Sequence, residues 1–324
     1  MAEWLVENGI GEQRAIRLEG GCAAAARIHW PGSLTAGQVS DAVLVSKPAG
    51  RTRGLARFEN GEEALVDRLP SAAQEGATLR LLVTRSKMSE TGRNKHAQAR
   101  PTEQQPCTAP SLIDSLLSAG AIARQVHRFP GSEWQEIWHE AWSGTTEFSG
   151  GSLQFSATPA MTLVDVDGSL SPHDLALAAV APLAGAVQRF DLAGSLGIDF
   201  PTLAAKAERR AVDNALEAAL ANWPHERTAM NGFGFVQLLS RLERPSLLHR
   251  IGQHRVGAAA RLLLRQAEAV HEPGKLLLTC HPGVKAKLKP AWLDELARRT
   301  GREVAVTSDP GLALSAGFAQ SVPA

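Results

Sequence analysis

The chain of 324 residues is 44% hydrophobic and 21% charged, which is typical of globular proteins, and its length suggests about two or three domains. Its net charge of +1 excludes a strongly basic nucleic-acid-binding protein but leaves a local basic patch open. Cys22, Cys107 and Cys280 lie far apart, which indicates neither a zinc ribbon nor a disulfide framework. With no apolar run of about 18 residues and no signal peptide before the charged start, we expect a cytoplasmic protein with no membrane partner.

The first 85 residues predict short strands separated by tight turns. Two of the turns carry hairpin signals, Glu19-Gly20-Gly21 and Asn60-Gly61. Closely spaced strands of this kind favour a small barrel, and the OB fold is the commonest barrel of that size. The next segment, 86–110, is polar, basic and proline-bearing, so it predicts a long loop or linker.

Residues 111–148 predict helix. Ser132 followed by Gln135 matches a capping box, and Gly144 is expected to end that helix. Its tryptophans recur every four residues: Trp134, Trp138 and Trp142. This spacing favours a buried helix face over a platform for stacking RNA bases.

From residue 150 the pattern changes to alternating strand and helix. "LQFSA" and "MTLVDV" predict strands, Ser171-Pro172 predicts the start of a helix that runs to about Arg189, and "SLGIDF" predicts the next strand. Strand–helix–strand units of this length favour parallel or mixed pairing with right-handed crossovers. The C-terminal part repeats the theme on a smaller scale, with "KLLLTC" and "EVAVT" as strands around a helix.

Three aspartates follow from this arrangement as a candidate site. The carboxyl ends of parallel strands lie at one edge of a sheet, so the crossover is expected to bring Asp165, Asp167 and Asp199 together. Their mutual repulsion calls for a cation, and hard oxygen ligands select Mg²⁺ or Mn²⁺, which suits phosphodiester hydrolysis. The alternative left open is an acidic strand end held by helix N-termini or lysines.

Two other motifs compete for "LVDVDGSL". An EF-hand loop would need glycine and glutamate where Leu170 and Ala176 stand, which excludes it. The opening motif of haloacid-dehalogenase-type phosphatases fits better, with Asp165 as nucleophile and Asp167 as acid. That family also needs a later Gly-Asp or Asp-Asp pair, and no later aspartate of this chain lies in one.

Three further segments carry a resemblance. "GSLQFSATPAMTLVDVDG", "DLAGSLGIDF" and "FGFVQLLSRLERPSL" resemble, in order and spacing, the catalytic region of the RNase E/G family of endoribonucleases. "GRNKHAQAR" is similar to the Asn-Lys-Gly segment that closes that family's OB domain. The resemblance is most specific over 150–247 and weaker over the rest of the chain.

The resemblance implies roles for individual residues. Asp165 and Asp199 would be Mg²⁺ ligands of a DNase I-like subdomain, and Asp167 stands where the family usually has Asn. Lys95, Arg241 and Arg244 would contact RNA, the two arginines near the scissile phosphate.

Three other residues are RNA-binding candidates with open alternatives. Arg209 and Arg210 follow Asp199 on the next helix, where a solvated helix face is the alternative. Phe58 would stack a base or instead fill the barrel core.

The chain also departs from the family. Only about 50 residues, 98–148, stand where the family has its 5′-sensor domain, and no Cys-Pro-x-Cys zinc-link follows "RPSL". We therefore expect no zinc, no zinc-linked oligomer and little dependence of cleavage on a 5′-monophosphate.

The expected fold is a multidomain α+β and α/β protein in four parts. These are N-terminal strands with an OB-fold barrel (1–97), a linker and helical segment (98–148), a DNase I-like/RNase H-like α/β catalytic region (149–250) and a small α/β domain (251–324). The leading hypothesis is a Mg²⁺-dependent endoribonuclease acting on single-stranded RNA. The alternatives are a non-catalytic RNA-binding protein on the same scaffold and a haloacid-dehalogenase-type phosphatase.

Overall fold

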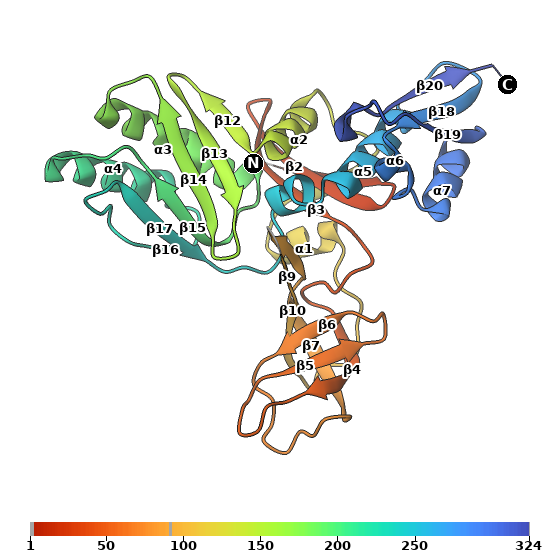
Figure 1. Ribbon diagram of the computed structural model, residues 1–324, viewed down its shortest axis with the longest axis horizontal. Coiled ribbons are helices and arrows are strands. Elements are labelled where there is room, and N and C mark those ends of the chain that lie inside the picture. Colours follow the sequence, from red (N-terminus) through yellow and green to blue (C-terminus); the bar gives the residue numbers. More distant parts are fainter. Residues whose placement is uncertain (1–2, 91–92, 324) are drawn as a thin grey trace.

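The computed structural model describes residues 3–90 and 93–323 and shows a mixed α/β protein with one closed barrel and several sheets. In Figure 1 the barrel projects downward from an elongated body. A six-stranded sheet forms one end of the body, and a three-stranded sheet with its helices forms the other. Within the described ranges, no helix is long and apolar enough to cross a membrane.

An N-terminal sheet lies in the middle of the body, in the order β11-β1-β2-β3. Its strands are β1 (Trp4–Gly9), β2 (Glu12–Glu19), β3 (Cys22–His29) and β11 (Ala123–Val126). The predicted hairpin between β2 and β3 is confirmed, because Gly20 and Gly21 both have positive φ and Glu19 pairs with Cys22. The barrel is therefore inserted in the chain between β3 and β11 of this sheet. A short helix, α1 (Leu112–Ser118), packs against this sheet.

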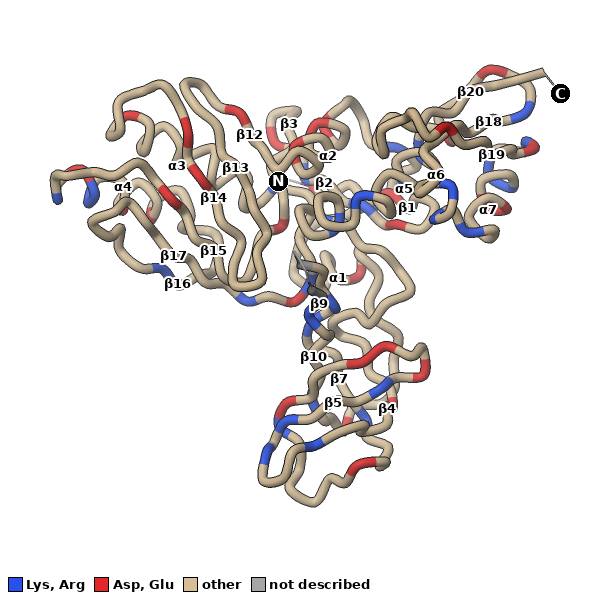
Figure 2. Tube along the Cα trace, in the orientation of Figure 1, with Lys and Arg blue, Asp and Glu red and all other residues tan. Residues whose placement is uncertain are grey.

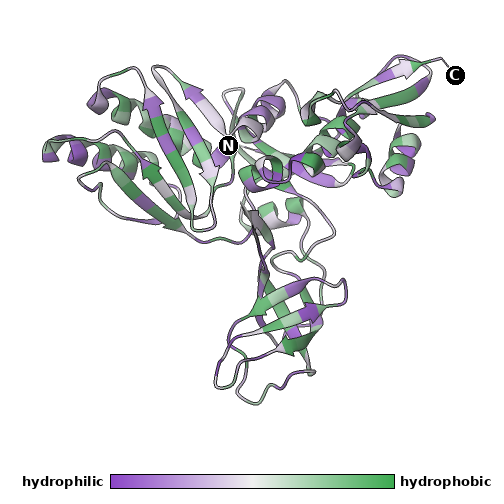
Figure 3. Cartoon of the chain, viewed as in Figure 1, coloured by the Kyte–Doolittle hydropathy of each residue, from purple (hydrophilic) through white to green (hydrophobic). Residues whose placement is uncertain are grey.

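The closed barrel has five strands in the order β10-β6-β5-β4-β7. They are β4 (Val39–Ser46), β5 (Gly54–Phe58), β6 (Glu63–Val66), β7 (Thr78–Arg85) and β10 (Ala97–Pro101). The Asn60-Gly61 turn joins the antiparallel pair β5 and β6, as predicted. Figure 3 shows hydrophobic and hydrophilic positions mixed along the barrel strands, as expected for strands with one face inward.

The prediction of a loop over 86–110 is wrong for its first half. That segment contains β8 (Met88–Glu90), β9 (Arg93–Lys95) and β10, which closes the barrel by pairing with both β6 and β7. Ala97 and Ala99 are buried in the barrel, while Gln98 and Arg100 between and beside them are not. The inward face of β10 is made of alanines, which carry little strand signal, so the polar outward face dominated the pattern.

The helix α2 (Glu133–Ser143) confirms the packing interpretation of the tryptophans and begins directly after Ser132, whereas the prediction of helix over 111–148 is wrong at the strands 123–126 and 145–148. Trp134 and Trp138 are buried, and Trp142 stacks on Trp138 with ring centroids 4.9 Å apart. The capping box is wrong, because Ser132 already has helical backbone angles and its hydroxyl lies 2.8 Å from the Glu136 carboxylate. The helix ends at Gly144 in the left-handed conformation, as predicted.

The six-stranded sheet has the order β12-β13-β14-β15-β17-β16. Its strands are β12 (Thr145–Phe148), β13 (Gly151–Ala157), β14 (Thr162–Gly168), β15 (Gly194–Asp199), β16 (Glu226–Arg227) and β17 (Phe235–Ser240). The crossover helix α3 (Pro172–Arg189) joins the parallel pair β14 and β15, and Ser171 caps it with Pro172 in the first turn, as predicted. Together with α4 (Lys206–Ala219), α3 contributes to the core beneath this sheet. The other face stays open.

The C-terminal part begins with a single π-helical turn, η1 (Leu248–Gly252), followed by α5 (Arg255–Glu268). The remaining elements are β18 (Lys275–Cys280), α6 (Pro282–Lys285), α7 (Pro290–Thr300), β19 (Val304–Ser308), the 3-10 turn η2 (Leu314–Ala316) and β20 (Phe318–Val322). The predicted strand–helix–strand theme is confirmed by the parallel pairing of β18 with β19. The antiparallel strand β20 completes this sheet. The division into four domains stays a prediction.

Candidate functional site

Two of the predicted aspartates are direct neighbours on the six-stranded sheet. Asp165 on β14 and Asp199 on β15 are register partners in a parallel pair, so their backbones lie about 4.8 Å apart across the strands. Asp167 lies two residues beyond Asp165 on the same face. Figure 2 shows acidic positions on both strands. The structure therefore brings these three side chains to one edge, as the crossover argument predicted.

The three carboxylates lie on the open face of the sheet. Asp165, Asp167 and Asp199 are exposed, whereas the alternate residues Val164 and Ile198 are buried against the helical layer. This alternation follows from the two-residue period of a strand. Strand ends therefore place the carboxylates in solvent, where a polymer with a charged backbone can reach them.

Electrostatics at this edge follow from burial and like charge. Partial burial, then the neighbouring charges of Asp167 and Asp199, raise the pKa of Asp165 above its ordinary value. The side-chain amide of Gln154 on β13 donates to a carboxylate oxygen of Asp167 at 3.1 Å. A bound cation would relieve the repulsion that this arrangement creates.

The donor set fits an ion that needs few protein ligands. Among the described residues, no three His, Cys, Asp or Glu side chains converge closely enough to enclose a metal ion. Mg²⁺ is commonly held by only one or two carboxylates, with water and substrate phosphate completing its shell. The facing pair Asp165 and Asp199 matches that requirement, and Asp167 is held by Gln154 at the side of the pair.

An exposed aromatic ring beside the acids was missed from the sequence. Phe233, in the loop before β17, has 80% of its surface exposed, and Phe235 is the register partner of Asp199. The side-chain oxygen of Asn231 accepts from the backbone N–H groups of Phe233 at 2.9 Å and Phe235 at 3.1 Å, which holds the loop in place. The available signal was a phenylalanine between two glycines in "NGFGF", a composition of turns rather than of cores.

The arginines after β17 do not lie beside the carboxylates. Because β17 runs antiparallel to β15, Phe235 faces Asp199 and Ser240 faces Gly194 at the far end. Five strand residues span about 17 Å, so Arg241 begins at the opposite edge of the sheet from Asp199. Arg241 therefore does not follow the carboxylate pair along these strands, and its role near the scissile phosphate stays a prediction.

The two arginines at that edge differ in how much they are already bonded. Arg244 donates to both carboxylate oxygens of Asp191, at 2.5 and 2.8 Å. Burial alone would lower the pKa of Arg244, but Asp191 and Glu243 raise it above its ordinary value. Arg241 has an exposed side chain and, among the described residues, forms an ion pair only with Glu243, at 3.1 Å. Arg244 therefore has a structural partner, while Arg241 remains accessible to a ligand.

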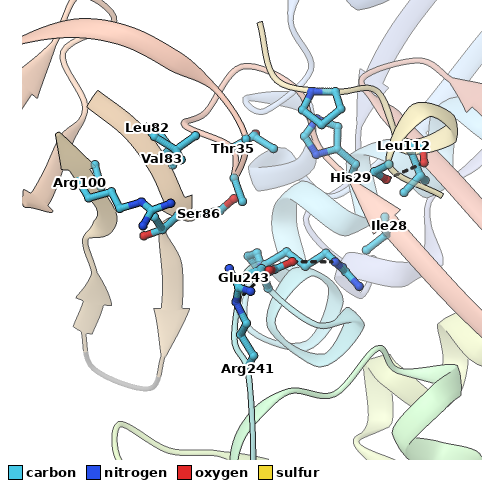
Figure 4. A pocket seen from close by; sticks show the side chains of 18 of the residues that line it. Ile28, His29, Thr35, Leu82, Val83, Ser86, Arg100, Leu112, Arg241 and Glu243 are labelled. Carbon is cyan, nitrogen blue, oxygen red and sulfur yellow. Dashed lines mark hydrogen bonds and ion pairs between the residues drawn. The ribbon is translucent and has the colours of Figure 1, made fainter. Parts of the chain in front are cut away.

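Both arginines line a cleft of about 550 Å³ where the barrel meets the body. Figure 4 shows Arg100 of β10 on the barrel side and Arg241 and Glu243 across from it. The charged side chains of this barrel cleft are Arg68, Arg100, Arg241, Arg244, Arg250, Asp67 and Glu243. Basic residues thus outnumber acidic ones, which makes the barrel cleft a candidate surface for phosphate groups.

The remaining candidates are scattered over the molecule. Phe58 is buried at 4% exposure in the barrel core, which decides between its two predicted roles and removes it as a base-stacking residue. Arg209 is used locally, because its guanidinium donates to the backbone oxygens of Leu203 and Ala204 before α4. Arg210 is exposed on α4, and Lys95 is half-buried on β9 at the neck between barrel and body.

No protein-family model and no curated protein matches this chain.

Proposed function

We propose that the protein is a Mg²⁺-dependent endoribonuclease that hydrolyses phosphodiester bonds of single-stranded RNA, as the resemblance to the RNase E/G family implies. The observation that carries the proposal is the register pairing of Asp165 with Asp199 on the open face of the sheet. Two carboxylates fixed side by side, with the pKa of Asp165 raised by burial and by its acidic neighbours, provide a binding position for a hard cation.

The residues have distinct roles in this proposal. Asp165 and Asp199 would hold Mg²⁺ (or Mn²⁺), and the Asp167 carboxylate, which accepts a hydrogen bond from Gln154, would orient the attacking water. When bound, the ion supplies an acidified water and neutralises negative charge on the phosphate. Phe233 offers its exposed ring to a base next to the scissile bond. Resemblance to the family implies products with 5′-phosphate and 3′-hydroxyl ends.

The position of the arginines favours a polymeric substrate. Arg241 follows Ser240, which lies about 17 Å along β17 from the register partner of Asp199, a span that a small phosphate ester cannot bridge. A single strand of RNA that contacts both places needs several nucleotides. This separation favours an endoribonuclease over a haloacid-dehalogenase-type phosphatase, which would act on small esters.

A second function rests on the same separation. A protein with an arginine-lined barrel cleft remote from its carboxylates also suits RNA binding without cleavage. Under this alternative Asp165 and Asp199 would be an acidic strand end with no chemical task.

An assay of labelled single-stranded RNA with and without Mg²⁺ separates the two functions. Cleavage should require the ion and should fall at least about 100-fold in Asp165→Asn and in Asp199→Asn, since metal stabilisation of the transition state is worth several kcal/mol. Asp294→Asn is the matched control, because Asp294 is exposed on α7 in the C-terminal part. Binding without cleavage in the unaltered protein would establish the second function instead.

The same assay tests the expected indifference to the 5′ end. One RNA is prepared with a 5′-monophosphate and with a 5′-triphosphate, and the two forms should be cleaved at similar rates. A large preference for the monophosphate form would contradict the prediction.

A further inference from the structure

A second cationic pocket shares Arg250 of η1 with the barrel cleft. It has a volume of about 630 Å³ and is lined by the chain after β3, the turn from η1 into α5, and the segment between α6 and α7. Its basic residues are Arg250, Arg255, Arg261, Lys287 and Lys289. We call it the α5 pocket. Among the described residues that line it there is no aspartate or glutamate, although Glu62 acts on Arg250 and Glu12 acts on Arg261 from outside the lining.

The positive potential is visible in a neighbouring histidine. Burial, and then the charges of Arg250, Lys287 and Arg261, lower the pKa of His254 below its ordinary value. Burial and the charge of Arg261 also lower the pKa of Arg250 to about 10, which still leaves that guanidinium protonated at neutral pH. The pocket therefore favours an anion.

The α5 helix adds its N-terminus to the same pocket. The helix has 14 residues, and its first turn, Arg255, Val256 and Gly257, lines the pocket. Within the described chain, its N-cap residue His254 makes no side-chain capping bond, and its first turn contains no acidic residue. The free N–H groups and the positive end of the helix dipole thus point to an anion that the protein itself does not supply.

Two buried donors in the wall of the pocket have no hydrogen-bond partner among the described residues. They are Nε of Arg250 and Nε1 of Trp30, on residues that are only 9% and 6% exposed. Leaving a buried donor unpaired is costly, so each of these donors is available to an acceptor that a ligand brings.

Arg261 shows by contrast what a satisfied arginine of this pocket looks like. Its guanidinium donates to the backbone oxygens of Gly11 at 2.8 Å and Gly257 at 2.9 Å. Its Cζ atom also lies 3.9 Å from the ring centroid of Trp30 and 4.7 Å from that of Trp292. Arg261 therefore builds the wall, while Arg250 and the two lysines remain for a ligand.

We propose that the α5 pocket is a binding site for a phosphate group, held by Arg250, Lys287, Lys289 and the first turn of α5. This chemistry has two sources, the phosphates of a free nucleotide or the backbone of a nucleic acid. The site is separate from the carboxylate face and does not depend on the nuclease activity proposed above.

Calorimetric titration of the full chain in metal-free, low-salt buffer tests this site with three probes: inorganic pyrophosphate, ADP and a short oligothymidine with hydroxyl ends. We expect one site per chain for at least one probe. The double variant Lys287→Gln/Lys289→Gln should weaken that binding by about tenfold or more, because two charge-assisted contacts are lost. Both lysines are exposed, so the double variant is expected to fold.

Lys285→Gln is the matched control, since Lys285 is exposed two residues away and lies outside the pocket lining. Its affinity should stay within about twofold of the unaltered protein. Tighter binding of ADP than of the oligonucleotide would assign the site to free nucleotides, and the reverse order would assign it to nucleic acid. Arg250→Gln should also lose binding, with its melting temperature measured to confirm that it folds.

The proposal would be overturned if no probe bound at one site per chain, or if the double variant and Lys285→Gln behaved alike. Asp165→Asn should bind the probe as tightly as the unaltered protein. The two proposals can therefore fail separately. If the unaltered protein bound pyrophosphate but never cleaved RNA, the nuclease proposal would be wrong and the α5 pocket would stand.

Discussion

The two ends of the six-stranded sheet differ in whether their charged side chains are paired. At one end Asp165 and Asp199 face each other with no ion pair among the described residues. At the other end Arg244 is clamped by Asp191, which also lies 3.8 Å from Arg27. Charge that is already paired builds the structure, whereas charge held unpaired at a strand end is available for a ligand. The difference between the ends therefore suggests where substrate chemistry occurs.

Removing the arginine clamp is expected to have the largest effect on stability. Arg244→Ala leaves the mostly buried Asp191 carboxylate without its bidentate partner, and Asp191 itself has a positive φ that the clamp stabilises. We expect a loss of about 2 kcal/mol, which is less than for a fully buried pair because Arg244 is partly exposed. Urea unfolding monitored by tryptophan fluorescence measures it.

Arg241→Ala is the control for this ion pair, because Arg241 is exposed and its one ion pair within the described part of the chain is with Glu243. Its cost should be below about 0.5 kcal/mol. Equal losses in the two variants would show that the arginine end of the sheet is not organised around Asp191.

The cationic surroundings of the arginine end should also appear in the pH dependence of stability. Burial and the charge of Arg250 lower the pKa of His29, which lines the barrel cleft, to about 4. Between the ordinary histidine value of 6.5 and 4, the unfolded chain takes up a proton that the folded chain does not. Stability is therefore lost as pH falls through this window.

Replacing His29 should remove that component of the acid loss. The difference in unfolding free energy between pH 7 and pH 4 should shrink by about 2 kcal/mol in His29→Gln, as judged by urea unfolding at each pH. His271→Gln, which changes an exposed histidine on the C-terminal side of α5, serves as the control. An unchanged pH profile in His29→Gln would show that burial and the charge of Arg250 do not lower the pKa of His29.

How much of this arrangement the sequence predicts depends on how local the cause is. The pairing of Asp165 with Asp199 follows from two strand ends and one crossover helix, because a right-handed βαβ unit fixes direction and edge together. The position of Arg241 depends instead on the antiparallel pairing of β17 with β15. No pattern within β17 specifies its partner strand or its direction. Resemblance to a family supplied a role for Arg241 but not its distance from the carboxylates.

Two other predictions from the sequence are wrong because the surrounding structure, rather than the local sequence, decides the outcome. The barrel strand β10 was hidden because its inward residues are alanines, whose burial is set by the surrounding barrel and not by their own propensity. Ser132 and Gln135 carry the letters of a capping box, yet the backbone is already helical at Ser132, so its hydroxyl reaches Glu136 instead. Phe58 lay between two roles until the closed barrel enclosed its ring.

The exposed ring at the acidic end provides a prediction about RNA affinity. Phe233→Ala should weaken binding of single-stranded RNA by about 1 kcal/mol, roughly fivefold, since one stacked base is lost. Fluorescence anisotropy in metal-free buffer measures this without cleavage. Stability should be unchanged, because the ring is 80% exposed. Phe318→Ala, an exposed phenylalanine on β20, is the control, and equal losses of affinity would remove Phe233 from the site.

The smallest expected effect is a gain of stability in Asp165→Asn, whereas variants at the arginine end should lose stability. This difference in sign tests the comparison of the two sheet ends most directly. Partial burial and its acidic neighbours raise the pKa of Asp165, so the folded chain binds a proton there more readily than the unfolded chain. Stability is thus lost as pH rises through the range just above 3.8, the ordinary pKa of an aspartate, and Asp165→Asn should restore it. Because Asp165 is mostly in solvent, screening limits the gain at neutral pH to below about 1 kcal/mol. If Asp165→Asn raises the melting temperature slightly and abolishes Mg²⁺-dependent cleavage, the charge of Asp165 serves function at the expense of stability. Asp191→Asn, by contrast, should lower the melting temperature. A fall in both variants would mean that the two ends of the sheet are organised alike, and the carboxylate pair would then be structural.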